Sequence, residues 1–287
     1  MDKKNRLLAM IDEKVVPVGM QCFTGNHTLI EVLGRTGFDY VWLDSEHCGI
    51  NPRALEDTIR TADGVGLVSL VRIPEPDDHT AARRALEAGA HGLVIPMVRS
   101  AADVRHIIDG VTYPPNGTRG ICPAYRAAGY SVRTFGEYAR TSDANVLVIP
   151  MIETLDALED IEEICAIEQV RIITFAAGEL SFALGQGAGM HGSPEIQAAY
   201  DKVKQAAKRH GVSLLGGNIL DPTSETAPRH SRTASRCSAS VWTSWRSAGF
   251  VRTLSNRSTP PWPDRPIPAP VLRRAAFPTA PDNNNER

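Results

Sequence analysis

Long hydrophobic runs are absent from this sequence of 287 residues. None reaches the ~18 apolar residues that a membrane-spanning helix requires, so no membrane partner is expected. The first apolar stretch is followed by charged residues at positions 12–14, which does not fit a signal peptide. An excess of positive charge is absent as well. The formal net charge is −2, which argues against a nucleic-acid partner.

Cysteine patterns typical of disulfide frameworks or zinc sites are also absent. The five cysteines are an odd number and form no C-x-x-C pair, so neither kind of site is predicted. A reducing, cytoplasmic location fits this usage best. By contrast, 42% of the residues are hydrophobic. That content suffices for the core of one large α/β domain or two smaller ones.

Strand-like and helix-like segments alternate through residues 1–222. Strands buried in a parallel sheet are expected at 15–23, 38–43, 67–71, 92–98, 146–152, 170–175 and 212–220. Helices are expected at 6–14, 28–35, 52–62, 80–88, 101–108, 155–166 and 194–210. This alternation predicts an α/β fold, a (β/α)8 TIM barrel. An open doubly wound sheet is the alternative, but no G-x-G-x-x-G follows the first strand.

The composition changes near residue 223. Residues 223–287 contain ten arginines, no lysine, nine of the 20 prolines and nine serines. Their ten basic and four acidic side chains leave the first 222 residues with a formal charge of −8. Such a composition is typical of a disordered extension. We therefore expect a barrel domain at 1–222 and an Arg/Pro/Ser-rich tail at 223–287 that replaces the eighth strand and last helix.

A shifted reading frame is a second interpretation of this tail. Joining the third base of each codon to the first two bases of the next, from Ala227 onward, permits the peptide Ala-Lys-Ala-Leu-Glu-Asp-Gly-Val-Thr-Val-Leu-Gly-Leu-Gly-Leu-Asp. The final Asp is required by Trp242 followed by Thr243. This peptide has the pattern of a helix end followed by an eighth strand. The third bases of codons 227–242 in the encoding DNA test the idea.

The most informative stretch is the point where an apolar segment ends in two acids and a histidine. Asp44, Glu46 and His47 come directly after the strand expected at 38–43. In α/β folds, ligands bind at the carboxyl ends of strands. Asp44 is near enough to orient the His47 imidazole and keep it basic, which suits His47 to catalytic proton transfer. A surface turn is an equally acceptable interpretation of D-x-E-H alone.

Three more charged residues follow other expected strands. Arg72 leaves a buried strand at its carboxyl end, where a guanidinium can bind a carboxylate or an enolate oxygen. Glu153 and Glu179 follow neighbouring strands. Two carboxylates, completed by water and substrate oxygens, suit Mg²⁺ or Mn²⁺. A solvated Arg72 and a helix-capping Glu153 are the simpler alternatives.

Two loops are candidate substrate contacts. The segment from Gly178 to Ser181 begins a helix, where free N–H groups can bind a carboxylate, although an ordinary helix cap fits as well. The long connection 113–141 carries Arg119 within Gly-Thr-Arg-Gly. A loop of this length is usually functional, and its arginines would suit an acidic substrate. A plain turn is the alternative for Arg119.

Together, these motifs resemble the HpcH/HpaI aldolase family, the class II pyruvate-dependent aldolases that include 2-dehydro-3-deoxyglucarate aldolase. The resemblance extends in family order over about residues 5–222. Its motifs are FDYVWLDSEH at 38–47, VR at 71–72, AGAHG at 88–92, PMV at 96–98, YPP at 113–115, GTRG at 117–120, IET at 152–154 and GELS at 178–181. An ordered set of this kind is far more specific than any single motif.

The resemblance implies a metal-dependent barrel that cleaves a 4-hydroxy-2-oxo acid into pyruvate and an aldehyde. Glu153 and Glu179 would hold Mg²⁺, Mn²⁺ or Co²⁺, Arg72 would stabilise the enolate, and His47 would move protons. The family usually has aspartate at position 179 and often glutamine at 151, where this chain has Glu179 and Met151. A homo-oligomer is also implied. The family forms hexamers through carboxyl-terminal helices, a segment that the unusual tail alters.

Two other functions stay open at this point. Some relatives of the family catalyse citrate-synthase-like condensations, so a lyase or condensing enzyme acting on oxaloacetate or a CoA ester is the first. The second is a catalytically inactive protein, because a barrel of seven strands has two unpaired sheet edges.

Overall fold

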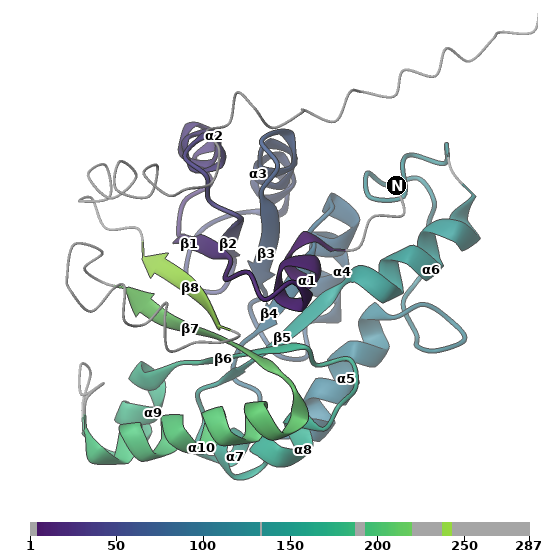
Figure 1. Cartoon of the computed structure of the whole chain (residues 1–287). Helices are drawn as coiled ribbons and strands as arrows, with labels where there is room; N and C mark the ends of the chain where they lie inside the picture. Colours follow the sequence, from purple (N-terminus) through teal and green to yellow (C-terminus); the bar gives the residue numbers. More distant parts are fainter. Residues whose placement is uncertain (1–4, 133, 187–192, 220–236, 243–287) are drawn as a thin grey trace, which may run out of the picture.

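A computed structural model describes residues 5–132, 134–186, 193–219 and 237–242. Figure 1 shows its elements in chain order. The strands are β1 Val18–Cys22, β2 Tyr40–Asp44, β3 Val68–Arg72, β4 Gly92–Ile95, β5 Leu147–Ile152, β6 Ile172–Phe175, β7 Ser213–Ile219 and β8 Cys237–Trp242. The helices are α1 Arg6–Asp12, α2 His27–Arg35, α3 Pro52–Gly64, α4 His79–Ala88, α5 Ala101–Val111, α6 Phe135–Asn145, α7 Leu155–Glu159, α8 Ile161–Cys165, α9 Ala177–Ala183 and α10 Pro194–His210.

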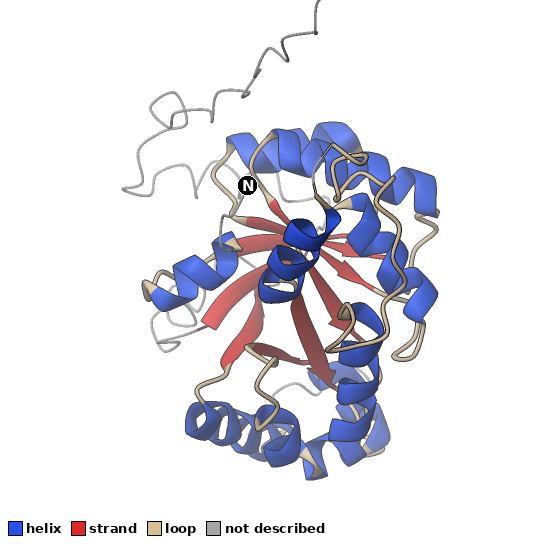
Figure 2. Ribbon diagram, turned by 90° about the vertical axis from the view of Figure 1, so that its right-hand side faces the viewer, coloured by secondary structure: helices blue, strands red, loops and turns tan. Residues whose placement is uncertain are grey.

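The strands form a closed parallel barrel in sequence order. Each strand pairs with the next, and β8 pairs with β1. Most helices lie outside the ring of strands, as Figure 2 shows. The predicted α/β, TIM-barrel-like architecture is therefore confirmed. None of the helices within the described ranges is long and apolar enough to cross a membrane.

The eighth strand differs from expectation, because the chain supplies it from the tail. Residues 237–242 pair with β7 on one side and with β1 on the other. The pairing with β7 is irregular between Gly216 and Ile219. A strand can form here because β1 and β7 otherwise leave rows of unpaired backbone groups, which any extended segment can satisfy. The remainder of 223–287 lies outside the described residues, and the shifted reading frame stays a prediction.

Side chains separate into two cores because successive strand residues point to opposite faces. Val41, Leu43 and Val71 pack outward against the helices. Tyr40, Trp42 and Leu70 point into the barrel. Helix α1 adds Leu7 and Leu8 to this inner core, with Asn5 donating to the backbone oxygen of His91 at 2.9 Å. Helix α1 thus closes the amino-terminal end of the barrel (Figure 2).

Local signals explain where most helices begin. Asn26 and Asn51 accept hydrogen bonds from the first turns of α2 and α3, and Ser100 forms a capping box at α5. The helix expected at 155–166 is two short helices joined at Asp160. Helix α9 lies where a helix was expected to begin, at 178–181, whereas helix α6 was not expected as a separate element. Helix α6 has no buried residue, so its sequence lacks the apolar stripe by which helices are recognised.

Candidate active site

Asp44 and Arg72 lie side by side because the register of β2 and β3 pairs them. Asp44 is 0% exposed and Arg72 is 6% exposed. The Arg72 Nε donates to Asp44 Oδ1 at 3.2 Å, and Nη2 donates to Oδ2. Burial acts to raise the pKa of Asp44, but hydrogen bonds from Arg72 and from the N–H groups of His47 and Glu46 outweigh it. The pKa is lowered, and the carboxylate stays ionised.

Glu46 connects this pair to His47. Its Oε2 lies 3.1 Å from Arg72 Nη1 and 3.5 Å from His47 Nε2. Asp44 was expected to orient the imidazole, but it accepts the backbone N–H of His47 at 3.1 Å instead. The carboxylate beside the imidazole is Glu46. The His47 side chain is 58% exposed, so it faces the solvent-accessible rim, where it can exchange protons with water.

Glu153 lies one residue past β5 and is 3% exposed. Its Oε1 accepts the backbone N–H of Met97 at 2.5 Å. Met97 has a φ of 50°, a left-handed conformation that is uncommon for a residue with a side chain. Thr154, rather than Glu153, caps helix α7 through a 3.0 Å hydrogen bond. The simpler interpretation of Glu153 as a helix cap is therefore wrong.

The electrostatics of Glu153 are those of a carboxyl group surrounded by like charge. Its pKa is raised to about 7, mainly by burial; the negative charges of Glu179 and Glu46 also raise it, whereas the Met97 N–H and Arg72 lower it. Glu179 and Glu153 are therefore within electrostatic reach of one another. Glu46, to which the sequence analysis assigned no catalytic or metal-binding role, belongs to the same cluster. Its position two residues after Asp44 was the available signal.

Glu179 lies in the first turn of α9, and its side chain is exposed. The N-cap residue Ala176 provides no side-chain hydrogen bond to this helix. Gly178 is partly exposed beside Glu179, whereas Ser181 is fully buried. The structure thus brings Gly178 to the rim with Glu179 and places Ser181 in the packed interior.

The donor set suits a hard divalent cation. Among the described residues, no three His, Cys, Asp or Glu side chains are gathered as a ready cation site. Glu153 interacts electrostatically with Glu179 and Glu46, and Glu46 also interacts with Glu179. Mg²⁺ is commonly held by one or two carboxylates plus waters and substrate oxygens. The residues present therefore fit such an ion, provided that substrate and water complete its coordination.

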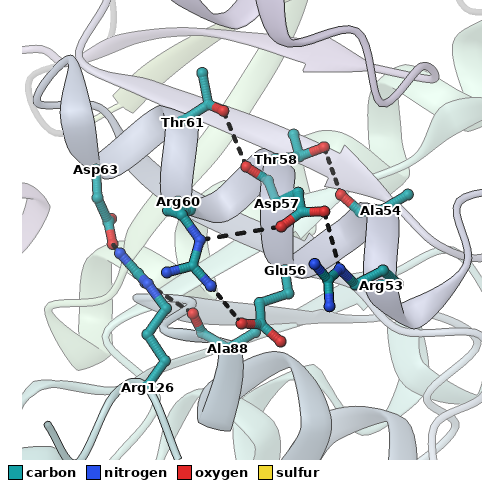
Figure 3. Close-up of polar contacts among 10 residues, drawn as sticks. All are labelled: Arg53, Ala54, Glu56, Asp57, Thr58, Arg60, Thr61, Asp63, Ala88 and Arg126. Atoms are coloured by element: carbon teal, nitrogen blue, oxygen red, sulfur yellow. Dashed lines mark hydrogen bonds and ion pairs between the residues drawn. The ribbon is translucent and has the colours of Figure 1, made fainter.

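Arg119 lies away from this site. Its neighbour in the same loop, Arg126, donates to the backbone oxygen of Ala88 at 2.8 Å and pairs with Asp63 at 2.5 Å (Figure 3). Ala88 and Asp63 lie at the carboxyl ends of α4 and α3. These ends are at the amino-terminal rim, because barrel helices run back along the strands. Arg119 itself is 1% exposed, with its guanidinium 4.5 Å from the Tyr113 ring.

The comparisons with known proteins identify the family. A family model described as HpcH/HpaI aldolase/citrate lyase matches residues 19–233. The chain belongs to this family. It is 31% identical over 210 residues to the 2-dehydro-3,6-dideoxy-6-sulfogluconate aldolase of Pseudomonas putida, covering 72% of this chain and 81% of the relative.

Other members agree in sequence and in fold. The hydroxypyruvate/pyruvate aldolase of Sagittula stellata is 27% identical over 226 residues, covering 77% of this chain and 88% of that protein. The crystal structure of an HpcH/HpaI aldolase/citrate lyase family protein from Burkholderia cenocepacia matches with a TM-score of 0.77 and 26% identity, covering 88% of this chain and 98% of that one. These relatives include named aldolases, which are carbon–carbon lyases, and this HpcH/HpaI chain is an enzyme of that class.

Proposed function

We propose that this HpcH/HpaI protein cleaves a 4-hydroxy-2-oxo acid into pyruvate and an aldehyde, using a divalent cation held by Glu153 and Glu179. The observation that carries the proposal is the convergence of Glu46, Arg72, Glu153 and Glu179 at the carboxyl ends of strands β2, β3, β5 and β6. When bound, Mg²⁺, Mn²⁺ or Co²⁺ would act as a Lewis acid toward the 2-oxo group and the substrate carboxylate.

Arg72 is placed to stabilise the negative charge that develops during cleavage. A guanidinium has five N–H donors, and Arg72 directs Nε and Nη2 to Asp44 and Nη1 to Glu46. The second hydrogens of Nη1 and Nη2 stay available for a substrate oxygen. Asp44 fixes the guanidinium plane, because two of its nitrogens bind one carboxylate. A positive charge held in advance is the arrangement that stabilises a developing enolate.

His47 and Glu46 supply the proton path. In cleavage, the hydroxyl at C4 loses its proton, the C3–C4 bond breaks, and C4 becomes the carbonyl carbon of the aldehyde. The electron pair left at C3 forms the enolate of pyruvate, which then takes a proton at C3. His47 can accept the first proton, directly or through water, because its imidazole is exposed and lies 3.5 Å from Glu46.

A pyruvate-release screen tests the proposal. Purified protein is treated with EDTA and then assayed with a panel of 4-hydroxy-2-oxo acids after separate addition of Mg²⁺, Mn²⁺ and Co²⁺. We expect metal-dependent pyruvate release that is lost in Glu153→Gln and kept in Glu163→Gln, a control at an exposed position of α8. Release that is insensitive to EDTA would contradict the assignment of Glu153 and Glu179.

The same screen separates the other candidate functions. Turnover of oxaloacetate or a CoA ester, with none of the hydroxy-oxo acids, would indicate the lyase or condensing alternative. A folded protein without turnover in any arm would indicate the inactive alternative. The identity of the aldehyde does not have to be known to decide between these outcomes, because every substrate of the proposed reaction releases pyruvate.

A further inference from the structure

A cavity of about 240 Å³ lies outside the barrel, behind the Asp44–Arg72 pair. Its inner wall includes Leu55, Val71 and Ile73, which are 7% exposed or less. Val71 and Ile73 belong to the outer core between the strands and the helices, whereas Arg72 between them points into the barrel. The cavity is therefore separated from the candidate active site by the backbone of β2 and β3.

The inner end of this cavity contains an unsatisfied hydroxyl group. Ser45 lines the cavity, and its Oγ is buried without a hydrogen-bond partner. Its backbone N–H donates to the Arg72 oxygen at 3.0 Å, so the residue is held in place by the sheet. A buried hydroxyl without a partner is unfavourable. A ligand oxygen in the cavity would give this hydroxyl the partner it lacks.

Two charged side chains, Asp78 and Arg84, line the cavity. Asp78 lines the cavity and caps α4, accepting the Ala81 N–H at 2.8 Å, so its charge is offset by the positive end of that helix. Arg84 also lines the cavity, its side chain is exposed, and it makes no hydrogen bond or ion pair with any described residue. Arg84 is therefore the cation available to a ligand.

Size sets the remaining property of the ligand. A cavity of about 150 Å³ holds benzene, with six non-hydrogen atoms, so 240 Å³ accommodates about nine by the same ratio. We propose that the cavity between α3 and α4 is a second binding site, for a small monocarboxylate with a short aliphatic chain. The chain packs on Leu55, Val71 and Ile73, and the carboxylate meets Arg84 at the entrance.

Titration with hexanoate tests this site independently of the proposed aldolase reaction. Binding is measured by calorimetry in EDTA, which leaves the metal-dependent site without its ion, and 1-hexanol and hexylamine serve as probes without the negative charge. We expect saturable hexanoate binding that is at least tenfold tighter than binding of either uncharged or cationic probe. The variant Glu153→Gln should bind hexanoate as the unaltered protein does.

Two variants at exposed positions of α4 locate the site. Arg84→Gln should weaken hexanoate binding at least tenfold, and Thr80→Trp, which places a large ring at the cavity entrance, should abolish it. Arg83→Gln is the matched control, because Arg83 carries the same charge one residue away and does not line the cavity. Binding that is absent, or that is equal in Arg84→Gln, Thr80→Trp and Arg83→Gln, would overturn the proposal. Thermal melts establish that each variant is folded.

Discussion

The guanidinium of Arg72 and the carboxylate of Asp44 form a buried two-point ion pair across neighbouring strands, with Nε 3.2 Å from Oδ1. Because both side chains are buried, water cannot solvate the charge of one of them if the other is removed. Removal of one partner from a buried ion pair typically lowers the free energy of unfolding by roughly 3–5 kcal/mol. The pair is therefore expected to determine both stability and activity.

The variant Asp44→Asn tests this ion pair. The folded pKa of Asp44 is lowered, so its ionisation contributes stability above the unfolded pKa of about 3.9, and that contribution is lost as the pH falls through the folded value. We expect the free energy of unfolding of the variant to be about 3 kcal/mol lower than that of the unaltered protein at pH 7. This difference should shrink below about pH 4. Urea unfolding from pH 3 to 7 measures it. A difference independent of pH would contradict the ionised pair.

Glu153 has the opposite sign of pH dependence. Its carboxyl ionises near 7 in the folded protein and near 4.5 when exposed, so the folded state loses stability as the pH rises from 4.5 to 7. In EDTA at pH 8, Glu153→Gln should be more stable than the unaltered protein by up to about 3 kcal/mol. The gain should vanish near pH 4.5. Equal stabilities at pH 8 would show that Glu153 is not destabilised by its surroundings.

His47 and Glu153 are expected to differ in what their loss affects. His47→Ala should lower turnover about 100-fold, the lower end of the range for general acid–base groups, and leave Mn²⁺ affinity nearly unchanged. Glu153→Ala should weaken Mn²⁺ binding far more than His47→Ala does. Calorimetric titration of Mn²⁺ and steady-state kinetics on both variants provide the comparison. Equal effects of both substitutions on both quantities would contradict these roles.

Barrel closure by β8 is testable by deletion. Removing residues 223–287 takes away the backbone pairing of β8 with both β1 and β7. We expect the shortened chain to melt about 5 °C or more below the full chain and to aggregate more readily, because two strand edges become free. A third protein, in which the alternative reading frame is restored from codon 227, is melted under the same conditions for comparison. Equal cooperative melts for the three proteins would contradict a structural role for this segment.

Much of the fold follows from the sequence because most of the barrel strands are predominantly apolar segments. Residues 38–43 and 147–152 end at Asp44 and Glu153, and parallel strands bring their carboxyl ends to one rim. Strand β8 has no such run, since its sequence is CSASVW. It is recognisable only once β1 and β7 are known to have free edges, which is a property of the assembled barrel.

The details of the site were less predictable, for physical reasons that differ by residue. The carboxylate beside His47 is Glu46 and not Asp44, because Arg72 already occupies both oxygens of Asp44. Sequence spacing does not reveal that competition. Arg119 was expected at the substrate, but α5 carries the chain back to the opposite rim before Arg119 is reached. The length of the 113–141 loop indicated a functional role, but it did not indicate at which rim of the barrel the loop lies.

Helix α1 closes the amino-terminal end of the barrel formed by the described residues. Leu7 and Leu8 fill the amino-terminal end from within, so substrates and both products pass through the carboxyl-terminal rim. In the proposed reaction, the oxo-acid half lies deeper, beside Arg72 and Glu153, and the aldehyde half lies nearer the solvent. The aldehyde is therefore expected to depart first and pyruvate second. An obligatory sequence of departure makes pyruvate the product that competes with the next substrate molecule for the empty enzyme.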